Sequence, residues 1–367
     1  MFSEREDFAV PKGNYTRETF QKKLVDSKAE IFNPHKKRKW IKIHGVRTRA
    51  SEWQDILRQF KKEEFGKVWR LGLPQYGGSD DRRPVDFYVC EYSPELLLFY
   101  TASANWEYEL SLQRFIEETV GLGQMWIGPE LFENLILHFM DAYNPTIERF
   151  WARRTKRDST PNKVGRDFSR RVDWGAEDSF ETIFELKERY GVRPTAIQMR
   201  LADGIFQMND DGMFVVTRLN SKMFGAFEEA MNFLKVEESL ITRSSQTVDL
   251  KVEKHSMPKG ELLVPNLTTG TITLNQVRLG NSTVSQIMDG GKFDFMDSST
   301  EEGSFSWIAT AIDKKKKSVF GVSSDERIIH LIPRYSATFE SFLDFYRQIV
   351  EEVDPSARFQ VPGGAVG

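Results

Sequence analysis

The chain has 367 residues, of which 40% are apolar and 13% aromatic, and its formal net charge at pH 7 is −3. A chain of this size and composition can bury two domain-sized cores, which argues against general disorder. Its single cysteine, Cys90, excludes an intrachain disulfide and a thiolate zinc cluster. The charged opening MFSEREDFAV and the lack of a long apolar run favour a cytoplasmic protein without membrane contact.

Local patterns in the first half of the chain predict short helices around one hairpin. Ser93-Pro94-Glu95 separates two apolar runs, which is a hairpin signal, and Pro129 is a favourable first-turn residue of a helix. In chain order we expect helices at 16–32 and 51–60, a hairpin of 86–92 with 96–103, helices at 109–122 and 129–143, and a strand at 146–152.

Similar patterns recur in the second half. Asn209-Asp210-Asp211-Gly212 predicts a tight turn, and the run Lys314–Lys317 predicts an exposed turn between two strands. We expect a helix at 179–190, strands at 195–201 and 213–219, a helix from Ser221, an extended segment at 239–253, strands at 305–312, 317–323 and 327–333, a helix from Ser336, and a tail beyond Pro355.

Strand pairs joined by tight turns, with amphipathic helices between the sets, favour an α+β fold with mainly antiparallel sheets. The order hairpin, helix, strand recurs three times, which suggests repeated units, although residue identity between them is negligible. We predict an N-terminal α+β domain at 1–155, a basic linker at 156–178, a C-terminal α+β domain at 179–355 and a tail at 356–367.

Common catalytic motifs are absent from the sequence. There is no GxxxxGK[ST] phosphate loop, no GxGxxG dinucleotide fingerprint and no GxSxG nucleophile elbow. The five histidines have no metal-binding spacing, and Cys90, inside an apolar strand, is expected to be an inert core thiol. These absences favour a protein that is not an enzyme and needs no cofactor.

Basic residues concentrate in two segments of this mildly acidic chain. Residues 35–49 carry seven Lys or Arg and no acid, and residues 149–174 carry nine against three Asp. Aromatic residues are interleaved in both segments, and most of the second segment's cations are Arg, whose planar guanidinium pairs with phosphate and stacks on rings. His44, near Arg47 and Arg49, fits a phosphate-facing patch.

A focused positive potential on an otherwise acidic body suits a polyanion, so we expect binding of DNA or RNA with little sequence specificity. The protein would act alone or as an accessory subunit of a nucleic-acid-handling complex. This expectation requires the two basic segments to converge in space. The expected phosphate-contacting residues are Lys36, Lys37, Arg38, Lys39, Lys42, Arg149, Arg153, Arg154, Lys156, Arg157, Arg166, Arg170 and Arg171.

Two alternatives remain open. Asp249 and Glu253, with Lys254 beside them, could hold Mg²⁺ or Mn²⁺ in a nuclease, because clustered carboxylates near a lysine suit such a site. An exposed strand of alternating charge explains the same residues more simply. The basic segments could also bind an acidic surface of a protein partner, as part of an interaction scaffold.

Overall fold

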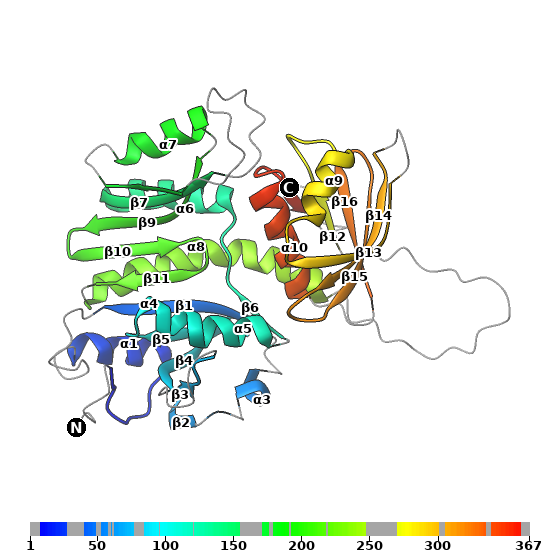
Figure 1. Ribbon diagram of the computed structural model, residues 1–367. Coiled ribbons are helices and arrows are strands. Elements are labelled where there is room, and N and C mark those ends of the chain that lie inside the picture. Colours follow the sequence, from blue (N-terminus) through cyan, green and yellow to red (C-terminus); the bar gives the residue numbers. More distant parts are fainter. Residues whose placement is uncertain are drawn as a thin grey trace. The chain divides into compact units, whose positions relative to one another are not determined.

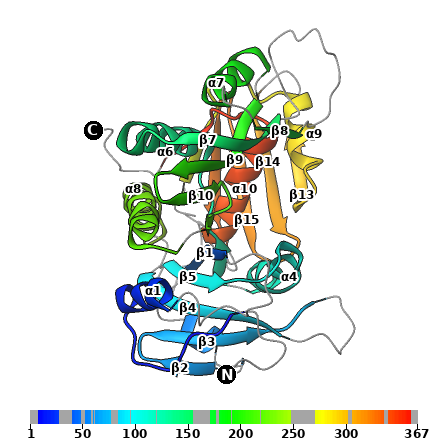
Figure 2. The same ribbon diagram turned by 90° about the vertical axis from the view of Figure 1, so that its left-hand side faces the viewer.

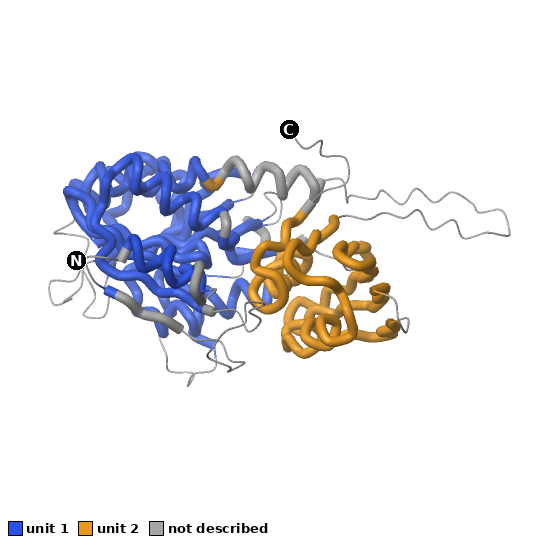
Figure 3. Tube along the Cα trace, turned by 90° about the horizontal axis from the view of Figure 1, so that it is seen from above, with its two compact units in different colours: residues 1–154, 169–233 blue, residues 155–168, 234–367 orange. Residues whose placement is uncertain are grey.

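The computed structural model describes residues 8–27, 40–48, 53–57, 60, 62–76, 84–94, 96–119, 121–154, 171–175, 179–190, 192–217, 219–246, 270–300, 305–334 and 339–360. For residues 54, 55, 62, 130, 154, 171–174, 179, 188–190, 235–246, 339 and 360 the description covers the backbone alone. These residues form two compact units (Figure 3). The first contains described residues up to Arg154 and from Arg171 to Phe233, and the second contains those from Leu234 onward.

The first unit is built on an 11-stranded sheet (Figure 1). All its described pairings are antiparallel, which confirms the predicted α+β class. The strand order is β2 (Lys62–Phe65), β3 (Val68–Leu73), β4 (Val85–Ser93), β5 (Leu96–Thr101), β1 (Ile41–Thr48), β11 (Met213–Val216), β10 (Gly204–Asn209), β9 (Val192–Leu201), β7 (Thr146–Arg154) and β8 (Arg171–Trp174), with β6 (Leu122–Gln124) also paired to β1.

Four helices pack on this sheet: α1 (Arg17–Asp26), α6 (Pro129–Tyr143), α7 (Ser179–Tyr190) and α8 (Ser221–Gln246). Figure 2 shows α1, α6 and α8 along one side of it and α7 at its β7 end. Aromatic pairs join three of them to strands: ring centroids lie 5.4 Å apart for Phe20 and Tyr100, 5.6 Å for Phe139 and Phe206, and 5.2 Å for Phe227 and Phe214. An ion pair between Lys187 and Glu133 links the fourth to its neighbour.

The opposite face is covered over β1, β3, β4 and β5. On these strands, side chains such as Val46, Leu97 and Phe99 point away from the four helices. They form a buried cluster with Leu112 and Phe115. The covering elements are α3 (Trp53–Leu57), α4 (Asn105–Tyr108), a π-helical turn at Glu109–Gln113 and α5 (Arg114–Glu118). Farther along the sheet, β7, β9 and β10 carry half-exposed and exposed polar side chains on this face, whereas Val215 of the intervening β11 is buried.

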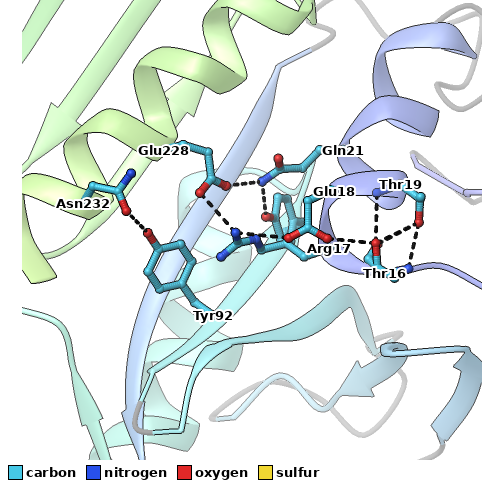
Figure 4. A network of polar contacts seen from close by, with 9 residues as sticks. Thr16, Arg17, Glu18, Thr19, Gln21, Tyr92, Glu228 and Asn232 are labelled. Atoms are coloured by element: carbon cyan, nitrogen blue, oxygen red, sulfur yellow. Dashed lines mark hydrogen bonds and ion pairs between the residues drawn. The ribbon is translucent and has the colours of Figure 1, made fainter.

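A polar network ties α1 to α8 above the sheet (Figure 4). Arg17 forms an ion pair with Glu228 at 3.3 Å, and its guanidinium carbon lies 4.4 Å from the ring centroid of Tyr92. Gln21 donates to the same Glu228 at 2.9 Å and to the hydroxyl of Tyr100 at 3.0 Å. Because each charged group here has an opposite charge or an amide beside it, this network explains how the two helices are held in place.

The second unit is a smaller antiparallel sheet packed on two helices, α9 (Asn281–Met288) and α10 (Phe339–Glu352). Phe345 of α10 lies 5.5 Å from Phe293 and 5.6 Å from Phe320, measured between ring centroids. The six strands are ordered β13 (Phe293–Thr300), β14 (Trp307–Asp313), β15 (Val319–Ser324), β16 (Ile328–Pro333), β12 (Gly270–Thr273) and β17 (Arg358–Gln360).

The four-lysine turn between β14 and β15 is confirmed as a hairpin turn. The buried carboxylate of Asp313 accepts hydrogen bonds from the backbone N–H groups of Lys315 and Lys316, both at 2.9 Å. Lys314 is paired with Asp294 at 3.1 Å, and Lys316 with Asp344 at 3.3 Å. The turn is therefore a structural feature whose charge is partly neutralised by neighbouring carboxylates.

Most predicted local elements are present, but three assignments change. Residues 239–246, expected to be extended, continue α8. The expected tail contains β17, which pairs with β12. The expected basic linker contains β8, whose four residues pair with β7. Short strands of this kind lack a local signal, because their stability comes from the partner strand.

The sheet also crosses the domain division expected at 156–178. β9, β10 and β11 follow that segment but are hydrogen-bonded into the same sheet as β1, through pairs such as Ile43 with Phe214. The first two of the three suggested repeats therefore belong to one sheet. The compact units separate near Phe233 instead.

A buried carboxylate in the second unit gives a test of this fold. Asp354 is fully buried and accepts hydrogen bonds from the backbone N–H groups of Asn275 at 2.7 Å, Gln276 at 2.8 Å and Ser356 at 2.9 Å. Asp354→Ala should lower the free energy of unfolding by about 3 kcal/mol, because several donors lose their acceptor. Chemical denaturation of the full chain measures this change.

Asp325 provides a matched control. It also accepts backbone N–H bonds in a turn, from Ile328 at 3.1 Å, but it is exposed, so water can replace it. Asp325→Ala should cost less than about 1 kcal/mol. Equal losses in the two variants would contradict the role assigned to Asp354.

Candidate functional site

The register of the first sheet places residues from both basic segments on one face. Lys42 of β1 lies opposite Val215 of β11, which lies opposite Gln207 of β10. Gln207 in turn lies opposite Gln198 of β9, which lies opposite Arg149 of β7. Directly opposite residues in antiparallel strands share a face. Lys42 and Arg149 are therefore members of one row, about 19 Å apart at four strand spacings.

A second row on this face is formed by arginines. Arg153 of β7 lies opposite Arg193 of β9 on one side and opposite the backbone of Arg171 of β8 on the other. The side chain of Arg153 is exposed and that of Arg193 is half-buried. This pairing brings two arginines together at the Arg153 end of β7.

Trp151 lies between these rows on β7. Phe150 and Ala152 are buried on the helix-covered side, whereas Arg149 and Arg153 are exposed and Trp151 is half-exposed. The guanidinium carbon of Arg149 lies 5.0 Å from the centroid of the Trp151 ring, within cation–π range. We call the six residues of these rows and of β7 the polar sheet face: Arg149, Trp151, Arg153, Arg193, Gln198 and Gln207.

One acid lies at the border of the polar sheet face. Glu148, the extra residue of a β-bulge between Ile147 and Arg149, forms an ion pair with Arg200 and accepts a hydrogen bond from Gln198 at 2.9 Å. Arg200 is therefore neutralised locally. The positive potential is accordingly expected to be strongest toward Arg153 and Arg193.

Lys42 has a structural role in addition to its place in the row. Its ammonium group donates to the carbonyl oxygen of Ser103 at 2.7 Å and to Oδ1 of Asn105 at 2.6 Å. It thereby holds the start of α4 against β1. Its position fits the predicted cationic surface, but its hydrogen bonds are directed to protein oxygens.

His44 does not face a phosphate site, contrary to the sequence-based interpretation. Its side chain is buried and stacks on Tyr108, with ring centroids 4.0 Å apart and planes 10° from parallel. Burial, with the nearby charge of Lys42, lowers the pKa of His44 to about 3, so the imidazole is neutral at physiological pH. The alternation Lys42, His44, Val46 places it on the covered part of the sheet.

The buried Cys90 confirms the predicted inert thiol. Desolvation raises the pKa of Cys90 to about 12, so the reactive thiolate is not populated at neutral pH. In the described part of the chain, no group of three or more His, Cys, Asp or Glu side chains could hold a metal ion.

Many predicted site residues lie outside the described residues. Arg154 and Arg171 are described by backbone alone, as parts of β7 and β8. The predicted nuclease residues Asp249, Glu253 and Lys254 are not described, and the same holds for the predicted phosphate contacts Lys36, Lys37, Arg38, Lys39, Lys156, Arg157, Arg166 and Arg170.

Three residues of the polar sheet face were not identified from the sequence: Arg193, Gln198 and Gln207. The alternation of Ile197, Met199 and Leu201 is a usable signal for Gln198, because it predicts that Gln198 points to the opposite face of the strand. The register that brings Gln198 beside Arg149 has no local signal. It depends on pairing between strands separated by about fifty residues of chain.

Comparisons with protein-family models, with curated proteins and with solved structures found no match. Within the described ranges, every helix is too short or too polar to cross a membrane.

The buried imidazole makes a prediction about pH. An unfolded chain binds a proton at His44 below its usual pKa of about 6.5, whereas the folded chain does not until about pH 3. This residue's contribution to the free energy of unfolding is complete above pH 6.5 and decreases as the pH falls toward 3, by about 3 kcal/mol at pH 4.5. Urea denaturation at several pH values measures it.

His44→Phe is the comparison, because phenylalanine keeps an aromatic ring against Tyr108 and cannot take up a proton. The difference in unfolding free energy between wild type and His44→Phe should shift in favour of the variant as the pH falls from 7 to 4.5. A difference that stays constant with pH would show that His44 is not buried in its neutral form.

Proposed function

We propose that the protein binds nucleic acid through the polar sheet face without catalysing a reaction, either alone or as an accessory subunit of a nucleic-acid-handling complex. The observation that carries the proposal is the cross-strand register, which gathers Arg149, Arg153 and Arg193 on one face and places Lys42 in the row of Arg149. These residues come from parts of the chain that are far apart in sequence.

The chemistry of the face supports phosphate as the ligand. Guanidinium groups make paired, charge-assisted hydrogen bonds to phosphate, and a row of them matches a repeating anion better than a single one. Phosphate contacts carry no base information, so little sequence preference is expected. The neutralisation of Arg200 by Glu148 gives the charged surface a boundary on one side.

Charge reversal at Arg153 tests the proposal at the arginine row. Arg153 lies opposite Arg193 and opposite the backbone of Arg171, so Arg153→Glu replaces one cation of a like-charged cross-strand pair with an anion. We expect at least about tenfold weaker binding to DNA or RNA, and thermal denaturation shows whether the variant is folded. Fluorescence anisotropy over a salt series measures both the affinity and its salt dependence.

The salt series gives a second, independent readout. Each lost phosphate contact should reduce the slope of log K against log salt by about 0.7 to 0.9. Lys222→Glu is the control: this exposed lysine is the second residue of α8, forms an ion pair with Asp203, and belongs to a helix whose Phe227 packs on Phe214 on the opposite face of the sheet. The proposal fails if wild type binds neither polymer, or if the two variants weaken binding equally.

The same purified proteins distinguish nucleic-acid binding from the two alternatives, a metal-dependent nuclease and a scaffold for an acidic protein partner. A nuclease would cleave labelled substrate with Mg²⁺ or Mn²⁺ and lose that activity in Asp249→Ala. A scaffold for an acidic partner would retain a co-purifying protein after nuclease treatment and lose it in Arg153→Glu. Binding that is reversible, metal-independent and sensitive to salt supports the proposed function over both.

A further inference from the structure

Trp151 gives the polar sheet face a feature that phosphate binding alone does not require. It is half-exposed at the centre of β7, with Arg149 and Arg153 two residues away on either side. Building on the proposed function, we propose that this face binds single-stranded rather than duplex nucleic acid, with an unpaired base stacked on the aromatic and guanidinium groups of Trp151 and Arg149.

The shape of the face argues against a duplex groove. The polar sheet face is formed by β7, β9 and β10, three neighbouring strands inside an 11-stranded sheet, whereas the major groove of B-form DNA is about 12 Å wide and admits a helix or a two-stranded ribbon. A sheet this wide cannot enter that groove. A flexible single strand can lie across the sheet, with its phosphates reaching arginines on different strands.

The spacing of charge and aromatic groups also fits a single strand. Arg149 and Arg153 are four residues apart on one strand, about 13 Å, with Trp151 midway between them. Phosphates can therefore be held on both sides of a base that stacks in the middle. Alternation of cations and rings is how proteins bind single strands without reading their sequence.

The amides of the polar sheet face, on the strands next to β7, supply groups that unpaired bases can use. Gln198 donates to Glu148 at 2.9 Å, and Gln207 donates to Asn209 at 2.9 Å. An amide has two N–H donors and a carbonyl oxygen with two lone pairs, so one hydrogen bond does not exhaust it. The Watson–Crick edges of bases are available to such groups in a single strand but are occupied in a duplex.

The test compares single-stranded and duplex oligonucleotides of equal length and sequence, by fluorescence anisotropy with the full chain. Wild type should bind the single strand more tightly. Trp151→Ala should weaken single-strand binding about 5- to 100-fold, as expected for the loss of one stacked base. Trp151→Phe should retain most of the affinity, because phenylalanine preserves a stacking face.

Phe305→Ala is the matched control for loss of an aromatic side chain. Phe305 is also partly exposed, but it belongs to the second unit, and its removal should leave single-strand affinity unchanged. Far-UV circular dichroism and thermal denaturation of each variant show whether the fold is intact. Should Trp151→Ala unfold, the comparison between wild type and Trp151→Phe and the cross-linking below still test the proposal.

Ultraviolet cross-linking of wild type to a single-stranded oligonucleotide locates the binding site on the protein directly. The adduct is expected on the peptide that contains Trp151, and an adduct only on other peptides would overturn the assignment. Equal affinity for both nucleic acids, with Trp151→Ala binding like wild type, would also overturn it while leaving the proposed function standing. If wild type binds neither nucleic acid, the proposed function itself fails.

Discussion

The two-residue period of the strands, locked by antiparallel pairing, is the constraint on which the first unit depends. Along β9, residues such as Ile197 and Met199 point into the helix-covered core, so the residue between them points to the opposite face. A shift of register by one residue would exchange the two sets and put arginines into the core. The burial of one face therefore fixes which side chains gather on the other.

Two β-bulges adjust this period where the polar sheet face is formed. One lies between Ile147 and Arg149, and the other lies beside Trp151. Without the first, Ile147 and Phe150 could not both be buried on one face, because they are three positions apart and an unbroken strand alternates every residue. Each bulge resets the alternation, so the core stays apolar while Arg149, Trp151 and Arg153 remain on the polar side. Bulges are frequent where a side chain has to be redirected for a function.

Elements with local signals could be predicted from the sequence, and those that depend on distant partners could not. The β4–β5 hairpin, the helix from Pro129 and the four-lysine turn each have their determinants within a few residues. β8 and β17 are too short to show alternation, and β1 pairs with a strand about 170 residues away. For the same reason, the basic residues could be recognised as a group, but the shared face of Lys42 and Arg149 required the register.

The two faces of the first sheet place their cations differently. On the helix-covered face, cations meet carboxylates: Arg17 meets Glu228, and Lys187 meets Glu133, so these charges join neighbouring helices. On the polar sheet face, the register places Arg153 opposite Arg193 and opposite the backbone of Arg171. Cross-strand register, more than the number of basic residues, gathers the arginines on which the proposed polyanion binding rests.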